Sequence, residues 1–351
     1  MKQTTFLKTA VILSVLVLAV LPVRVIAAEP AKELVGDWRM TGEANGRPMD
    51  SILSLALDKD GKLVGKTINF FGVIELKDIK FEADKLTFAQ TMRFRDNEST
   101  SNFTGTLKDG KLTGTMSSER GEYNLQGARI QPKPAITGVW EITTKRTDRE
   151  TTSTLTIKAD KDGKLSGLWK SQRGEGEVSD VSFKDDKLSF KRKMQSQDQQ
   201  QAESTYELTV KGDAMTGKSS SPRGEASLTG KRANPPVVGT WELTMTSERG
   251  ERKQLLTIYP DLSALYGPSE LEKIIVEDNK VSFKMSRTFG DRTFEMEFKG
   301  TLEGDKLTGE MTTGPDNPAQ KVVGKKIVPG AKPEAKPQIK AETPKEKPAA
   351  K

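Results

Sequence analysis

Carboxylates are the only side chains in this sequence whose spacing suggests metal binding or acid–base chemistry. The 351 residues include neither cysteine nor histidine, which excludes thiolate chemistry, disulfides and imidazole-based triads. The segments Asp58-Lys59-Asp60-Gly61 and Asp160-Lys161-Asp162-Gly163 resemble the opening of a calcium loop. No third acidic ligand and no glutamate at the twelfth position follow, so hairpin turns explain both segments. We expect neither a metal nor another cofactor.

Two pairs of carboxylates are the remaining candidates for general acid–base catalysis. They are Asp185 with Asp186, and Glu295 with Glu297. A catalytic pair needs a cleft and perturbed pKa values, whereas both pairs lie among predicted strand and turn residues. We therefore expect a protein that is not an enzyme.

Trp169 is the one tryptophan of the four that lies outside a repeated motif. Filling of a core is the simplest role for it, and a platform for a carbohydrate or another ligand is the alternative. The triplet Arg-Gly-Glu occurs four times, starting at residues 120, 173, 223 and 249. Glycine turns flanked by solvated charges explain these triplets, with a shared recognition surface as the alternative.

The other three tryptophans belong to a motif that divides the chain into three repeats. The motif reads Gly36-Asp37-Trp38, Gly138-Val139-Trp140 and Gly239-Thr240-Trp241, and each block ends in a basic residue after a glycine. A repeat of this length indicates whole domains rather than solenoid turns. The predicted repeats are 34–130, 136–232 and 237–327, joined by the proline-bearing segments 131–135 and 233–236.

Each repeat carries about eight short runs of alternating apolar and polar residues, separated by Asp-Gly or Asp-Lys turns. This pattern is typical of antiparallel hairpins with one buried face. Eight strands are enough for a sheet to close, so the sequence predicts an all-β protein of three tandem up-and-down β-barrels. Repeats of a β-sandwich remain the alternative. In the third repeat, Pro260-Asp261-Leu262-Ser263 and Pro268 replace a regular turn and predict a shorter or irregular hairpin.

The Gly-x-Trp motif on the first strand, the meander of strands and the closing basic residue resemble lipocalins and the wider calycin group. The resemblance implies that each tryptophan plugs one barrel end and that a cation from the last strand packs across it. The implied pairs are Trp38 with Arg129, Trp140 with Arg232, and Trp241 with Lys325 or Lys326. The repeats are shorter than lipocalins and lack an evident flanking helix.

The two ends of the chain differ from the repeats. Residues 1–28 combine a basic start, an apolar run and a small-residue cleavage site, which predicts a signal peptide, export and no membrane span after cleavage. The tail 328–351 is rich in Lys and Pro and is expected to be disordered or extended, with weak attraction to anionic surfaces. Of the net charge of +7, the signal and the tail carry three each, which leaves +1 for the repeats and argues against nucleic-acid binding.

These observations predict an exported, non-catalytic binding or interaction protein of the cell envelope, with an envelope partner or a small ligand. A carrier of small apolar ligands inside the barrels is one alternative, and a hydrolase that uses carboxylates at a barrel end is another. Because interior positions hold Leu, Ile and Phe, we expect no large cavity. A void inside any repeat would favour ligand carriage instead.

Overall fold

The computed structural model describes residues 29–327, apart from 95–96, 148, 161, 196–200, 248–249, 290–291 and 315–316. The predicted signal peptide and tail lie outside the described residues. Strands make up almost all of the regular structure, and the short α1 (Glu29–Lys32) precedes them. Within the described part of the chain, no helix is long and apolar enough to cross a membrane.

The first repeat forms a closed antiparallel barrel in which each strand pairs with the next and the last strand pairs with the first. Closure through β1 and β8 leaves no free sheet edge. The strands are β1 (Gly36–Ala44), β2 (Arg47–Leu57), β3 (Leu63–Asn69), β4 (Gly72–Glu82), β5 (Lys85–Phe94), β6 (Asn97–Lys108), β7 (Lys111–Ser118) and β8 (Gly121–Arg129).

The second repeat closes in the same way, through β9 and β16. Its strands are β9 (Gly138–Lys145), β10 (Glu150–Ala159), β11 (Leu165–Ser171), β12 (Gly174–Lys184), β13 (Lys187–Gln195), β14 (Gln201–Lys211), β15 (Ala214–Ser221) and β16 (Gly224–Ala233). Two closed barrels rule out the alternative of sandwich repeats for this part of the chain.

The third repeat is a nearly closed sheet of nine strands, with β20 and β21 at its two edges. The irregularity falls where the sequence predicts it, because Pro268 lies in the turn between two strands of only three residues. The strands are β17 (Gly239–Ser247), β18 (Gly250–Ile258), β19 (Ala264–Tyr266), β20 (Ser269–Leu271), β21 (Ile274–Glu277), β22 (Lys280–Phe289), β23 (Arg292–Glu303), β24 (Lys306–Thr313) and β25 (Gln320–Ile327). The prediction of three tandem antiparallel barrels is confirmed, with the third one incompletely closed.

The hairpin turns follow from the aspartates of the sequence. Asp58 Oδ1 accepts hydrogen bonds from the backbone N–H groups of Asp60 at 2.9 Å and Lys62 at 2.8 Å. Asp160 bonds Asp162 and Lys164 in the same way. One carboxylate oxygen of Asp58, and likewise of Asp160, therefore stabilises the turn by accepting backbone hydrogen bonds. This agrees with the expectation that the two segments are hairpin turns rather than calcium loops.

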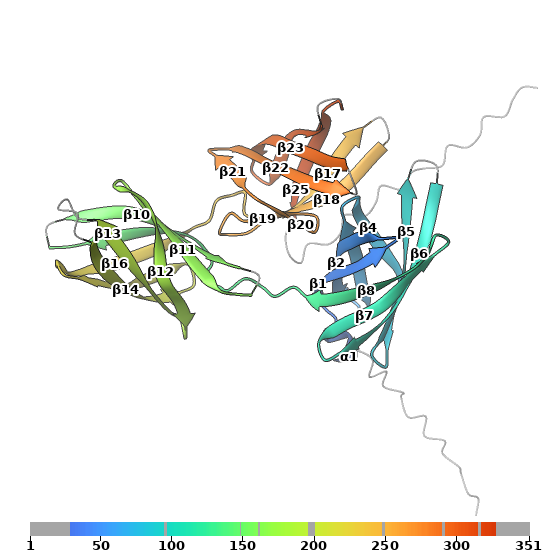
Figure 1. The fold of residues 1–351 in the computed structure, drawn as a ribbon, viewed down its shortest axis with the longest axis horizontal. Coiled ribbons are helices and arrows are strands. Elements are labelled where there is room, and N and C mark those ends of the chain that lie inside the picture. Colours follow the sequence, from blue (N-terminus) through green and yellow to red (C-terminus); the bar gives the residue numbers. More distant parts are fainter. Residues whose placement is uncertain are drawn as a thin grey trace, which may run out of the picture.

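The first and third barrels lie side by side, and the second lies apart from them at the far side of the molecule (Figure 1). Phe70, in the turn between β3 and β4 of the first barrel, packs against the core of the third. The joint between the first two barrels also contacts the third, because Lys133 Nζ lies 3.0 Å from Asp261 Oδ2. The irregular turn at Pro260–Ser263 therefore receives this joint.

Candidate functional site

The end of each barrel at which the chain enters is closed by the tryptophan of the Gly-x-Trp motif. Trp38, Trp140 and Trp241 have no exposed surface. Each indole Nε1 donates to the backbone carbonyl four residues earlier, at 2.9 Å to Leu34, 3.0 Å to Ile136 and 2.7 Å to Val237. The ring and the segment before the first strand therefore cover the barrel end together.

A cation from the last strand lies over each of these rings. The guanidinium carbon of Arg129 is 4.4 Å from the ring centroid of Trp38, and that of Arg232 is 4.1 Å from Trp140. In the third barrel the cation is Lys326, with Nζ 5.4 Å from the ring of Trp241. Lys325 is exposed, because neighbouring residues of a strand point to opposite faces. Of the two lysines considered for this place, Lys326 is the one above the ring.

Two structural constraints require glycine at the first position of the motif. Gly36, Gly138 and Gly239 have φ values of +126°, +143° and +133°, which side chains with a Cβ rarely adopt. A Cβ at Gly138 would also lie 2.5 Å from Nη1 of Arg232. The glycine of the motif therefore allows the backbone its positive φ and leaves room for the cation, and the tryptophan supplies the ring on which the cation lies.

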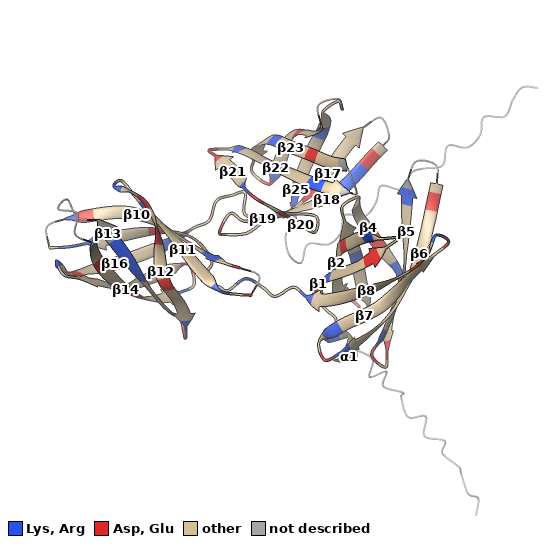
Figure 2. Ribbon diagram, in the orientation of Figure 1, with Lys and Arg blue, Asp and Glu red and all other residues tan. Residues whose placement is uncertain are grey.

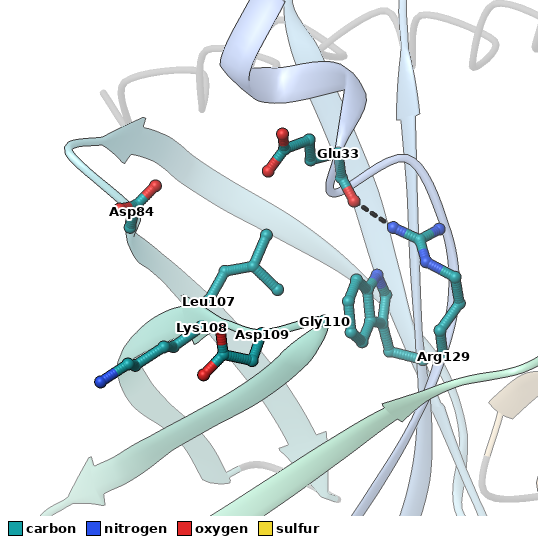
Figure 3. A pocket seen from close by; sticks show the side chains of 8 residues that line it. Glu33, Asp84, Leu107, Lys108, Asp109, Gly110 and Arg129 are labelled. Atoms are coloured by element: carbon teal, nitrogen blue, oxygen red, sulfur yellow. Dashed lines mark hydrogen bonds between the residues drawn. The ribbon is translucent and has the colours of Figure 1, made fainter.

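A cleft of about 530 Å³ lies beside this closed end in the first barrel, lined by residues that include Trp38, Leu107 and Arg129 (Figure 3). The guanidinium of Arg129 donates to the backbone carbonyls of Glu33 and Val35 rather than into the cleft. The polar groups here serve the closure of the barrel, so we do not regard the cleft as a ligand site.

A second cavity, of about 490 Å³, occupies the opposite end of the second barrel, where the hairpin loops open to solvent. We call it the cup. Its lining residues are Thr144, Arg146, Arg149, Glu150, Thr151, Thr152, Ser153, Trp169, Ser171, Gln172, Arg173, Arg192, Ser204, Tyr206, Ser219 and Arg223. The expectation that no repeat has a large cavity is therefore wrong for the second barrel.

An aromatic cluster lies at the inner end of the cup, where Trp169 and Tyr206 belong to the lining and Phe190 packs against both. Phe190 and Tyr206 stack with centroids 4.5 Å apart, and Trp169 lies 5.3 Å from Tyr206 and 6.1 Å from Phe190. The guanidinium carbon of Arg192 is 5.1 Å from the ring centroid of Trp169. Trp169, the tryptophan outside the repeated motif, therefore both fills the core, being 2% exposed, and lines the cavity, so the structure is compatible with either role expected for it.

Two polar atoms in the wall of the cup are buried and lack a hydrogen-bond partner within the described chain: Trp169 Nε1 and Ser204 Oγ. The other three indole N–H groups of the protein all have backbone acceptors. Buried polar groups in native proteins are nearly always paired, and an unpaired one costs about 1–3 kcal/mol. Trp169 and Ser204 both belong to the lining of the cup, and a third buried atom without a partner, Gln90 Oε1, lies at the position of the first barrel that corresponds to Arg192.

Arginines dominate the charge of the cup. Its lining residues include the arginines at 146, 149, 173, 192 and 223, against one carboxylate, Glu150. Arg173 and Arg223 each begin an Arg-Gly-Glu triplet, so these turns contribute to the rim. Elsewhere, acidic and basic residues are interspersed over all three barrels (Figure 2).

Strand register shows how the lining of the cup differs from the same level of the third barrel. Tyr206 faces Ser219 across the strands, in the same register in which Phe103 faces Met116 and Phe298 faces Met311. One step further toward the loops, Arg192 faces Ser204, whereas Gln90 faces Ser101 and Met285 faces Met296. At these positions the second barrel has Ser204 and Ser219, whose small side chains leave space open. The third barrel has Met296 and Met311, whose side chains fill that space.

The mouth of the third barrel is also covered from outside. Gln254, which corresponds in register to Ser153 of the cup, has no exposed surface and bonds the Asn69 carbonyl of the first barrel. Phe70 packs beside it against the third core. The turn between β3 and β4 of the first barrel therefore covers this side of the third barrel.

The paired carboxylates lie away from the cup. Asp185 and Asp186 form an exposed turn with φ values of +50° and +59°. A hydrogen bond from Lys299 holds the pKa of Glu297 below its ordinary value, and Glu295 is exposed. Within the described ranges, no group of three or more acidic residues is arranged to hold a metal ion.

No protein-family model matches the sequence, and the search of curated proteins finds no match. Solved structures give distant matches. A proposed outer membrane protein of Bacteroides fragilis is 14% identical over 57% of this chain and 98% of its own, with a TM-score of 0.26. A protein of the DUF3598 family from Nostoc punctiforme is 11% identical over 84% of this chain and 97% of its own, at 0.19. Transferrin binding protein B of Haemophilus parasuis is 12% identical over 82% of this chain and 74% of its own, at 0.20. At these scores the matches carry no argument about function.

Proposed function

We propose that the protein is an exported, non-catalytic binding protein that holds a small molecule in the cup of its second barrel. The observation that carries this proposal is the pair of buried, unpartnered polar atoms, Trp169 Nε1 and Ser204 Oγ, in the wall of an open cavity of about 490 Å³. Ligand sites are concave, and this one is lined mostly by polar side chains, with Trp169 and Tyr206 as its aromatic members.

A role for the other two barrels follows from their contacts. The first and third barrels contact one another through Phe70 and Gln254, and the third also contacts the joint at Lys133. We propose that these two barrels form a scaffold that presents the second. Export rests on the sequence of residues 1–28.

The proposal is tested by filling the cup with the side chains that fill the third barrel. The double substitution Ser204→Met/Ser219→Met gives the second barrel the pair formed in the third by Met296 and Met311. Binding of the fluorescent dye 1-anilino-8-naphthalenesulfonate to the full chain is titrated before and after the change. We expect one site per chain, weakened at least about tenfold by the filled cavity.

The matched control is Ser101→Met. Ser101 corresponds to Ser204, and Met116 already stands at the position of Ser219, so this change gives the first barrel the same pair of methionines. Dye binding should stay within about twofold of the unchanged chain. Equal binding by all three proteins, with each folded by circular dichroism, would show that the cup is not the binding site.

A further inference from the structure

We propose, on the basis of the function proposed above, that the ligand of the cup is a small organic anion with a planar, apolar body. Its charged group would lie at Trp169 Nε1, Ser204 Oγ and Arg192, and its body would lie along the aromatic cluster. The donors, the charge and the shape of the cup each support such a ligand.

The donors require an acceptor. An indole N–H can only donate, and the Trp169 Nε1 atom is buried with no acceptor among the described residues. Ser204 Oγ, also buried, can donate to the same ligand group. A hydrocarbon ligand would leave both atoms unpaired, at a cost that oxygen atoms of a ligand remove. The wall of the cup therefore selects a molecule that carries oxygen acceptors.

The charge selects an anion among such molecules. Arg192 faces Ser204 in the strand register, lines the cup, and has its guanidinium carbon 5.1 Å from the ring centroid of Trp169. An arginine keeps its charge in any protein site, and its planar donors match a carboxylate, sulfonate or phosphate. Four further arginines line the rim, against one glutamate, and would attract an anion from solution.

The two aromatic residues of the lining favour a flat body of limited size. Trp169 and Tyr206 line the cup with ring centroids 5.3 Å apart, and Phe190, outside the lining, stacks on Tyr206 at 4.5 Å. Rings of a ligand can stack on such side chains. A volume of about 490 Å³ admits a molecule of a few rings and excludes a folded partner or a polymer.

Two dyes of nearly the same shape, one anionic and one neutral, distinguish the contribution of charge to affinity from that of apolar packing. The anionic 1-anilino-8-naphthalenesulfonate differs from the neutral N-phenyl-1-naphthylamine by its sulfonate. We expect the anionic dye to bind the full chain at least about tenfold more tightly, since the charged group satisfies buried donors. We also expect its affinity to fall as salt increases, through the rim arginines.

The decisive variant is Arg192→Gln, because the first barrel carries Gln90 at the corresponding position and folds with it. The anionic dye should lose about 10- to 100-fold in affinity and the neutral dye less than about twofold. Arg120→Gln, in the Arg-Gly-Glu triplet of the first barrel, is the matched control and should change neither.

The outcomes distinguish the two proposals. If the methionine pair abolishes binding while both dyes bind alike and Arg192→Gln has no effect, the cup is a binding site but the anion inference is wrong. If the methionine pair leaves dye binding unchanged, the proposed function itself fails.

Discussion

Gln254 of the third barrel donates a hydrogen bond of 2.8 Å from Nε2 to the backbone carbonyl of Asn69 in the first barrel. Its amide is wholly buried, and the same side chain also accepts a bond from the N–H of Leu255 through Oε1. Next to it, Phe70 packs on the third core and lies 5.2 Å from the guanidinium carbon of Arg287. Two repeats that are distant in sequence thus share a buried contact.

We predict that the first and third barrels stay together when both proline-bearing joints are cut by limited proteolysis. The apolar contact of Phe70 and the buried amide bond of Gln254 hold them without a covalent link. Size-exclusion chromatography should separate a two-barrel species from the second barrel, although a denaturing gel shows three fragments. Phe70→Ala should release three single barrels. Three separate species from the unchanged chain would contradict the prediction.

Trp140→Ala should lower the free energy of unfolding of the second barrel by about 3–5 kcal/mol. The ring is fully buried and its indole bonds Ile136, so its removal leaves a cavity and an unpaired carbonyl at the barrel end. Hydrogen exchange of peptides from 138–233 in the full chain measures the change. A loss below about 0.5 kcal/mol, as for an exposed residue, would show that the ring does not plug the barrel.

The cations over the rings offer a graded comparison. Arg232 bonds the carbonyls of Ala135 and Thr137 and also Asp213, whereas Lys326 bonds one carbonyl, that of Pro236. Arg232→Met should therefore destabilise its barrel by about 2 kcal/mol and Lys326→Met by about 1 kcal/mol. Equal losses would indicate that packing of the side-chain stem dominates in both barrels.

The contact between Lys133 and Asp261 should weaken in acid. Burial alone would raise the pKa of Asp261, but hydrogen bonds from Ser263 and Lys133 bring it below its ordinary value of 3.8. Since the folded-state pKa is the lower one, the stabilisation is complete above about pH 4 to 5 and is lost as the pH falls through the folded-state pKa. Asp261→Asn should destabilise the third barrel by about 2 kcal/mol at pH 7 and by less at pH 3. Thermal unfolding across this range measures both. An equal difference at the two pH values would contradict the assignment.

Ser204→Met/Ser219→Met should raise the stability of the second barrel by about 1–2 kcal/mol while it weakens dye binding at least about tenfold. The change fills a cavity and removes a buried hydroxyl that has no partner. Calorimetry of the full chain measures the shift of the unfolding transition. Destabilisation by more than about 1 kcal/mol would indicate that the cup lacks room for the two side chains.

The sequence predicts most of the barrel architecture, because strand alternation and Asp-Gly turns are local signals. It also singles out Trp169, since the other tryptophans share a motif, and the irregular hairpin after Pro260. It does not predict the cup. Serines such as Ser204 and Ser219 are ordinary on the solvent face of a strand, and only the register shows that they point inward. Once the registers are known, the cup can be recognised from the serine at position 219, where the other two repeats have Met116 and Met311.

The contact between the first and third barrels is also hidden from the sequence. The turn Asn69-Phe70-Phe71-Gly72 carries two aromatic residues at a hairpin tip, where polar residues are usual, and this is the one local sign of a buried role. Which surface receives Phe70 depends on the joints and on the shape of the third barrel, neither of which has a local pattern.

The indole N–H signals of the four tryptophans report whether a ligand in the cup bonds Trp169. In a ¹H–¹⁵N spectrum of the full chain labelled at tryptophan, three of these groups are bonded to backbone carbonyls and Trp169 is not. Trp169→Phe identifies its signal. On addition of 1-anilino-8-naphthalenesulfonate, the Trp169 signal should move downfield as it gains an acceptor, while those of Trp38, Trp140 and Trp241 stay in place. A bound dye that leaves the Trp169 signal unmoved would contradict the account.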